Sequence, residues 1–356
     1  MMAVDTLNSN THSLTDEDFL DYAMSHGFGD LHFKVDPATG MKAIIAIHNT
    51  KLGPALGGCR FIEYDNTASA IKDAMRLARG MSFKAASVNL PLGGGKSVII
   101  KPKQAFDRNA YFHAFGKFVE ELNGRYITAL DSGTLLDDME IIAEHTNYVA
   151  SKRNQGDPSP YTARGVLRGI EAAVSFKLNK DSLSGLHIAI QGLGHVGFAL
   201  ASHLHELGAK LTVADVNSDM VNKAVNEFGA TAVSTDSIHK VACDVFAPCA
   251  LGAILNDLSI PQLQTNIIAG AANNQLAHTY HGESLFDKGI LYAPDYVINA
   301  GGLIFAGHKY LMQSDTTILQ EVDNINQLLL NIFIRSAKEN KPTNDIADLI
   351  AKEKLA

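Results

Sequence analysis

Tryptophan and cysteine are the scarce residues of this sequence. Tryptophan is absent, and cysteine occurs at only three positions. Three cysteines cannot all pair with one another, and Cys59, Cys243 and Cys249 lack the spacing of a zinc site. This excludes a disulfide-stapled scaffold and favours a reducing compartment. We also expect no bound metal.

Long apolar runs and basic clusters are missing as well. No apolar run reaches the length of a membrane span, and residues 1–20 lack the basic and apolar regions of a secretion signal. The formal net charge is −8, without a basic run that would attract phosphates. We therefore expect a cytoplasmic protein that binds neither membranes nor nucleic acid.

The size and composition of the chain predict two globular domains. The chain has 356 residues, of which 46% are hydrophobic and 19% are charged, so it can bury a large core. Residues 151–160 are polar and contain glycine and two prolines, as a linker does. We expect a substrate-binding and oligomerisation domain over residues 1–150, joined by C-terminal helices from about 330–356, and a second domain over residues 151–329, with a cleft between the two domains.

The first half of the chain mixes helices and strands. A helix is predicted to begin near Thr15, where three acids follow in the first turn. Asp131 comes at the end of a short strand, and Thr134 with Asp137 resembles a capping box that opens the next helix. The other predicted elements are a β-hairpin over 31–35 and 43–48, helices over 68–81 and 109–122, and a strand over 125–129.

The second half alternates strands and helices. Short apolar strands are predicted at residues 187–191, 210–214, 245–247 and 267–269, each followed by glycine, proline, asparagine or aspartate. This alternation predicts an α/β fold with a doubly wound parallel sheet. Further helices are predicted over 162–176, 317–337 and 346–355.

A glycine pattern follows the first of these strands. Gly192, Gly194 and Gly197 form Gly-x-Gly-x-x-Gly between a strand and a helix, with Asp215 23 positions after the first glycine at the end of the next strand. This context is that of a dinucleotide-binding turn, although a tight turn without a ligand is the alternative. The residues predicted to contact the cofactor there are Gly192, Leu193, Gly194, His195, Val196 and Gly197. Asp215 would bind ribose hydroxyls and repel a 2′-phosphate, which favours NAD over NADP.

Two lysines flank a glycine-rich stretch in the first half. Lys84 and Lys96 are separated by a segment that includes Gly93, Gly94 and Gly95, and we expect both on one glycine-rich loop that approaches a ligand. An ordinary loop with a solvated lysine is the alternative. A phosphate-loop motif requires a glycine at position 90, where the chain has leucine. One lysine could hold a substrate carboxylate while the other, with a lowered pKa, acts as a base. Asp131 is then a candidate proton carrier, although a turn-forming aspartate is the alternative.

Distinctive segments occur along nearly the whole chain. They are LGPALGGCR (52–60), RLARGMSFKAASVNLPLGGGKSVI (76–99), NGRYITALDSGT (123–134), SPYTARGV (159–166), QGLGHVG (191–197), CDVFAPCALGAILND (243–257), IIAGAANNQL (267–276) and GILYAPDYVINAGG (289–302). In these segments the chain resembles the leucine/phenylalanine/valine dehydrogenase branch of the glutamate/leucine/phenylalanine/valine dehydrogenase superfamily. The resemblance implies that Lys84 holds the substrate carboxylate, Lys96 is the catalytic lysine and Asp131 carries protons. It also implies that Thr162 and Asn273 help to place the cofactor and that Asn274 lines the substrate end, in a homo-oligomer that converts an L-amino acid to a 2-oxo acid and ammonia.

The substrate side chain is predicted from the pocket wall. Leu56, Gly57, Leu303 and Ala306 are expected to line it, without a cation for a second carboxylate, so glutamate is disfavoured. Branched-chain amino acids are our first expectation. Ala306 is smaller than the valine common in leucine enzymes of this family, which keeps phenylalanine open as the alternative.

Two other functions compete with this interpretation. A dinucleotide sensor without catalysis would not need Lys84, Lys96 and Asp131 together. A phosphate-loop kinase is disfavoured by the failed spacing at Leu90. His203 and His205 are two positions apart on a predicted helix and do not share a face, so we do not expect them to bind a ligand.

Overall fold

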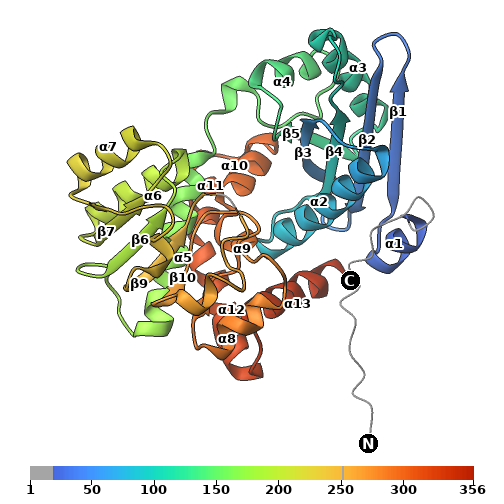
Figure 1. The fold of residues 1–356 in the computed structure, drawn as a ribbon. Coiled ribbons are helices and arrows are strands. Elements are labelled where there is room, and N and C mark those ends of the chain that lie inside the picture. The colour runs from blue at the N-terminus through green and yellow to red at the C-terminus, as the bar shows by residue number, and fades with distance from the viewer. Residues whose placement is uncertain (1–18, 251) are drawn as a thin grey trace, which may run out of the picture.

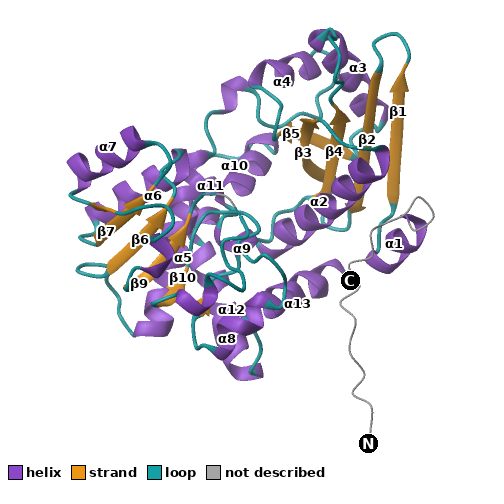
Figure 2. Ribbon diagram, viewed as in Figure 1, coloured by secondary structure: helices purple, strands orange, loops and turns teal. Residues whose placement is uncertain are grey.

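A computed structural model describes residues 19–250 and 252–356 of the chain. Two β-sheets, each covered by helices, lie apart from one another in it (Figures 1 and 2). The helix expected to begin at Thr15 falls partly outside the described residues, where α1 (Phe19–His26) is its described part. No helix in the described ranges combines the length and apolar character that a bilayer crossing demands.

The first sheet has five strands in the order β1-β2-β4-β3-β5. Strands β1 and β2 form the predicted antiparallel hairpin, β2 pairs antiparallel with β4, and β3 lies parallel between β4 and β5. The strand bounds are β1 (Asp30–Asp36), β2 (Met41–Asn49), β3 (Ala55–Ile62), β4 (Gly93–Ile100) and β5 (Tyr126–Leu130).

Helices cover both faces of this sheet because its strands alternate their buried side chains. Ile44 of β2 packs in one apolar cluster with α2 (Thr67–Ser87), and the next residue, Ile45, packs in another with α3 (Arg108–Glu121) and α4 (Leu136–Ala143). Successive strand residues point to opposite faces. The sheet is therefore the middle layer of three.

The prediction that Lys84 and Lys96 share a loop is wrong. Helix α2 does not end near Met81 but runs on to Ser87, because the residues after Gly80 include buried side chains that pack in the core, so Lys84 is helical. Lys96 lies within strand β4. The glycines beside it allow close packing instead: a Cβ at Gly94 would lie 2.0 Å from the backbone nitrogen of Ser82.

The second sheet is the predicted doubly wound parallel sheet, which the structure confirms. Its order is β11-β10-β9-β6-β7-β8, and every neighbouring pair is parallel. The bounds are β6 (His187–Gln191), β7 (Lys210–Ala214), β8 (Thr231–Ala232), β9 (Cys243–Pro248), β10 (Thr265–Ile268) and β11 (Leu291–Tyr292). The helices of this half are α5 (Ser159–Leu178), α6 (His195–Glu206), α7 (Ser218–Phe228) and α8 (His281–Asp287), with 3-10 turns at Arg153–Gln155, Ile238–Lys240 and Ile260–Gln262.

The last helices connect the two halves. Helix α12 packs against α5, whereas α13 lies against α2 beside the first sheet (Figure 1). Lys354 of α13 donates to the backbone oxygen of Ala86 at 3.0 Å. The helix predicted over 317–337 is divided at Asn324. The bounds are α9 (Asp295–Ile298), α10 (Gly301–Tyr310), α11 (Asp315–Asp323), α12 (Ile325–Glu339) and α13 (Thr343–Leu355).

Candidate active site

A buried ion pair lies at one end of the first sheet. Lys96 of β4 contacts the carboxylate of Asp131, which directly follows β5, and their side chains are 7% and 21% exposed. Strand β3 runs between these two strands. A Cβ on Gly58 of β3 would lie 2.7 Å from Cβ of Asp131 and 3.1 Å from Nζ of Lys96. The pair therefore depends on the missing side chain at Gly58.

Both members of the pair have shifted pKa values. Burial lowers the pKa of Lys96, although the Asp131 carboxylate opposes the shift. Burial alone would raise the pKa of Asp131, but the Lys96 ammonium and the Arg60 guanidinium bring it below its usual value. A lysine that releases its proton more easily beside a carboxylate that stays ionised is suited to general-base chemistry.

Arg60 also contacts Asp131. It is not among the site residues predicted from the sequence. Its Nε lies 3.4 Å from Oδ2 of Asp131, and its Nη1 lies 2.8 Å from Oδ2 of Asp73, which also accepts from the hydroxyl of Tyr64 at 2.7 Å. Arg60 and Gly58 are two residues apart on one strand and so share a face. That alternation is a signal from which Arg60 could have been found.

Lys84 is held by a chain of two asparagines. Its Nζ donates to Oδ1 of Asn299 at 2.7 Å, and Nδ2 of Asn299 donates to Oδ1 of Asn273 at 2.8 Å. Burial lowers the pKa of Lys84 to about 8, with Asp295 opposing and Lys96 adding to the shift. Asn273 is predicted from the sequence as a site residue, whereas Asn299, the buried link between Lys84 and the second half of the chain, is not.

The predicted pocket residues belong to two elements. Leu56 is buried in β3, and Leu303 is buried in α10, where Ala306 lies three residues further along and is partly exposed. Gly57 accepts a hydrogen bond from the hydroxyl of Tyr126 at 2.7 Å. Leu56 and Leu303 belong to the same cluster of buried apolar side chains.

The turn after β6 is closely packed at Gly192 and Gly197 and open at Gly194. Gly192 has a φ of 98°, and a Cβ on Gly197 would lie 2.0 Å from the backbone oxygen of Gly192. A Cβ on Gly194 would meet nothing within 4 Å, so the surface at the start of α6 is open. Backbone amides at such a helix start attract anionic groups. His195 is exposed and Val196 half-buried beside this opening.

Asp215 lies beside the same turn. Its carboxylate accepts from the backbone nitrogen of Leu193 and, at 2.7 Å, from that of Asn217. It therefore stabilises the glycine turn. Thr162, near the start of α5, lies against Gly302 of α10, where a Cβ would come within 2.8 Å of the Thr162 hydroxyl.

Asn274, next to Asn273, has a left-handed φ of 51°. No hydrogen bond or ion pair between described residues joins Lys84 or Lys96 to residues 192–197. It stays a prediction that the two lysines face the glycine turn across a cleft between the domains.

The capping box predicted from Thr134 and Asp137 is wrong. Helix α4 is capped at Leu135, whose backbone nitrogen donates to Asp138 at 2.7 Å. The hydroxyl of Thr134 instead accepts from the backbone nitrogen of Asp131 at 2.9 Å, and the backbone oxygens of Asp131 and Cys59 lie 2.7 Å and 3.1 Å from it as acceptors for its proton. Asp137 and Asp138 lie in the first turn of α4, where carboxylates stabilise the helix dipole.

Comparisons with known proteins agree with this geometry. Residues 29–148 match the family model "Glu/Leu/Phe/Val dehydrogenase, dimerisation domain", and residues 216–354 match "Glutamate/Leucine/Phenylalanine/Valine dehydrogenase". Leucine dehydrogenase of Geobacillus stearothermophilus is 46% identical over 338 residues, or 94% of this chain and 92% of that protein. L-tryptophan dehydrogenase of Nostoc punctiforme is 46% identical over 319 residues, or 89% and 90% of the two chains.

A solved structure shares the whole architecture. The crystal structure of L-tryptophan dehydrogenase from Nostoc punctiforme superposes with a TM-score of 0.87 and 43% identity, covering 94% of this chain and 98% of that one. Both family models and these relatives together span nearly all of the described residues. The chain belongs to the glutamate/leucine/phenylalanine/valine dehydrogenase family.

Proposed function

We propose that this protein catalyses the NAD-dependent, reversible oxidative deamination of an L-amino acid, with a branched-chain amino acid as the preferred substrate. The buried Lys96–Asp131 pair carries the proposal, because it offers a base with a lowered pKa next to an ionised carboxylate. Family membership supports the same reaction class.

Each residue has a distinct proposed role. Lys84, fixed by Asn299, binds the substrate carboxylate as an ammonium ion. A nicotinamide cofactor supplies the acceptor for the hydride that leaves Cα of the substrate. Neutral Lys96 then takes a proton from the water that attacks the resulting imine. Asp131 carries protons to and from the amine, which leaves as ammonia.

The proposed cofactor is NAD. The open surface at Gly194 and the helix start behind it suit a pyrophosphate. Asp215 next to it suits ribose hydroxyls and repels a 2′-phosphate, and the following residues Val216 and Asn217 bring no positive charge. Thr162, Asn273 and the residues of the glycine turn are proposed to complete the cofactor site.

The proposed substrate specificity follows from the apolar residues Leu56, Leu303 and Ala306, with Gly57 and Asn274 beside them. A second carboxylate left unpaired among such side chains would cost several kcal/mol, so glutamate is disfavoured. An aromatic amino acid is the second candidate, because Ala306 is small and partly exposed. The 46% identity to an L-tryptophan dehydrogenase supports an aromatic substrate as the alternative.

The substrate proposal is tested by kcat/KM for leucine, valine, phenylalanine and glutamate with NAD, in the wild type and in Ala306→Val. We expect leucine or valine to be best, and Ala306→Val to lower the value for phenylalanine by about tenfold or more relative to leucine. Ala337→Val, at an exposed position on α12, is the matched control. A preference for glutamate would contradict the proposed pocket.

We also propose the assembly and domain division expected from the sequence. Residues 1–150, joined by the C-terminal helices over about 330–356, would form the substrate-binding and oligomerisation part, and residues 151–329 the cofactor part. Phe33 and Val35 on the edge strand β1 are 56% and 62% exposed, which supports a homo-oligomer. Sedimentation equilibrium of the wild type and Phe33→Lys would test it, and a monomeric wild type would contradict it.

A further inference from the structure

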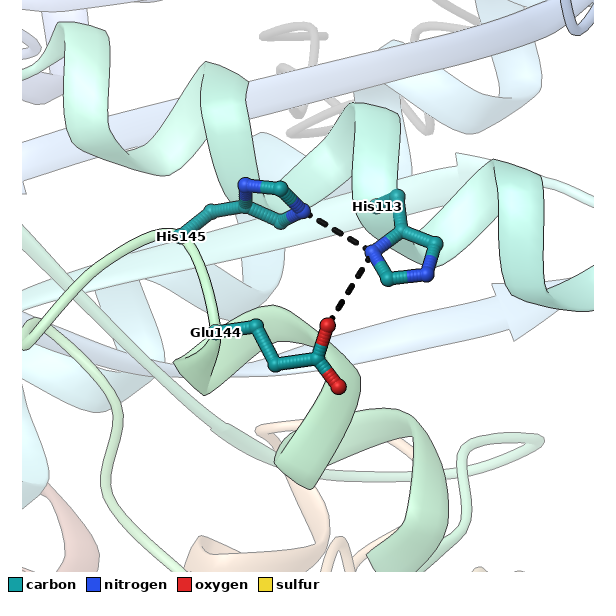
Figure 3. A group of neighbouring side chains, drawn as sticks. All are labelled: His113, Glu144 and His145. Atoms are coloured by element: carbon teal, nitrogen blue, oxygen red, sulfur yellow. Dashed lines mark hydrogen bonds and ion pairs between the residues drawn. The ribbon is translucent and has the colours of Figure 1, made fainter.

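Two histidines and a glutamate converge where α3 meets the end of α4. His113 lies on α3, and Glu144 and His145 directly follow α4 (Figure 3). Nδ1 of His113 is 2.8 Å from Nε2 of His145 and 3.6 Å from Oε2 of Glu144. One ligand atom from each residue lies within 4.8 Å of the other two. None of the three shares a hydrogen bond or ion pair with Lys84, Lys96 or Asp131.

The packing of the two helices fixes this arrangement. A Cβ on Gly116 would lie 3.1 Å from Cβ of His145 and 3.0 Å from the backbone oxygen of Ile142. Gly116 is one turn after His113 on α3, so the close approach at Gly116 brings His145 toward His113. Phe112 and Phe115 anchor α3 in the core beneath. The backbone that carries the three side chains is therefore held by core packing and by the close helix contact at Gly116.

The two facing imidazole nitrogens have room for one proton between them. A neutral imidazole carries its proton on only one nitrogen, so one ring donates and the other accepts. A divalent cation would let both nitrogens present lone pairs, with the proton moved to the outer nitrogen of the donating ring. The carboxylate would add a third ligand and a negative charge.

The distances suit a small transition-metal ion. Two ligand atoms on a tetrahedral zinc with bonds of about 2.0–2.1 Å lie roughly 3.3 Å apart. The two separations that involve His113, 2.8 Å and 3.6 Å, fall on either side of that value. The ligand atoms of His145 and Glu144 lie within 4.8 Å of one another, so side-chain rotations must draw the three groups around the ion. Imidazole donors favour zinc, nickel, cobalt or copper over calcium and magnesium.

Against the expectation of no bound metal from the sequence, we propose that His113, Glu144 and His145 bind one zinc-class divalent metal ion per chain. His113 contributes Nδ1, His145 contributes Nε2 and Glu144 contributes a carboxylate oxygen, which leaves a fourth position for water. The ion links α3 to the end of α4 and so stabilises the layer that covers one face of the first sheet. The site is separate from the proposed chemistry at Lys96.

The test is metal titration of the full chain, made without a histidine tag and stripped with a chelator. Co²⁺ binding is followed by visible absorbance and Zn²⁺ binding by calorimetry. We expect one equivalent per chain, lost in His113→Gln and in His145→Gln. Glu144→Gln should weaken binding by about tenfold or more. His205→Gln, an exposed histidine on α6, is the matched control and should bind as the wild type does.

Thermal unfolding gives a second readout. Saturating Zn²⁺ should raise the Tm of the wild type and of His205→Gln, but not that of His113→Gln. Glu144 is 62% exposed, so its glutamine variant keeps the site testable if a histidine variant fails to fold. Binding that is absent from the wild type, or undiminished in Glu144→Gln and His113→Gln, would overturn the proposal and leave only a hydrogen-bonded histidine pair.

Discussion

Lys84 donates a hydrogen bond to Asn299 at 2.7 Å, between residues 215 positions apart in the sequence. The bond joins α2, beside the first sheet, to the residue that follows α9, beside the second. Asn299 passes the contact on to Asn273. The proposed anchor of the substrate carboxylate is therefore oriented by the half of the chain that carries the proposed cofactor site.

Removal of Lys84 should act on substrate binding. Lys84→Ala is expected to raise KM for the amino acid by about 10–100-fold, because a charge-assisted hydrogen bond to the carboxylate is lost. Asn299→Ala should raise KM by about 3–10-fold, since the ammonium stays but is less well oriented. Steady-state kinetics check both. Lys354→Ala is the control, because Lys354 of α13 donates to Ala86 near the end of α2. An equal rise in KM in that variant would contradict the assignment.

Substrate affinity should fall at alkaline pH. Burial lowers the pKa of Lys84 to about 8, so its ammonium is present below that pH and lost above it. The Kd of a 2-oxo acid, which has no amine of its own to titrate, is expected to rise by about tenfold per pH unit above pH 8. Calorimetry between pH 7 and pH 9.5 measures this. A constant Kd over that range would show that Lys84 does not bind the carboxylate.

Gly58 should be intolerant of a side chain. In Gly58→Ala the new Cβ would lie 2.7 Å from Cβ of Asp131, so the Lys96–Asp131 pair must move, and kcat/KM should fall by about 100-fold. Gly80→Ala is the control, because its Cβ would meet nothing within 4 Å. That variant should keep full activity and gain up to about 1 kcal/mol of helix stability. Normal activity in Gly58→Ala would contradict the proposed site.

Asp215 should control the choice between NAD and NADP. Asp215→Ala is expected to lower the NAD-to-NADP ratio of kcat/KM by about tenfold or more, since the ribose acceptor and the repulsion of a 2′-phosphate are both lost. Asp215→Asn keeps an acceptor for the backbone nitrogens of Leu193 and Asn217, which separates the effect of charge from that of turn structure. An unchanged ratio in both variants would refute this role.

Features set by neighbouring residues could be predicted from the sequence. The turn from Gly192 to Gly197 and the acid at Asp215 are local to one strand, one turn and the next strand. The β-hairpin and the parallel sheet also follow from short-range alternation. These elements are found in the structure where the patterns place them.

Features set by distant contacts could not be predicted. From the sequence, the glycines before Lys96 predict a ligand-binding loop. In the fold they allow close packing against Ser82 and other groups that only the tertiary structure brings near. Asn299 was missed because its partner Lys84 is remote in the sequence. His113 and His145 likewise form no motif, since Gly116 brings them together through helix packing.

The central claim is that Lys96 performs the chemistry of amino-acid oxidation, and formation of NADH at 340 nm tests it most directly. Wild-type protein with NAD and leucine should give a steady rise in absorbance, as should Lys103→Ala, an exposed lysine just after β4. Lys96→Ala should lose about 100-fold or more in kcat while NAD still binds. A Lys96→Ala variant that keeps the wild-type kcat, or changes KM and kcat as Lys84→Ala does, would contradict the account.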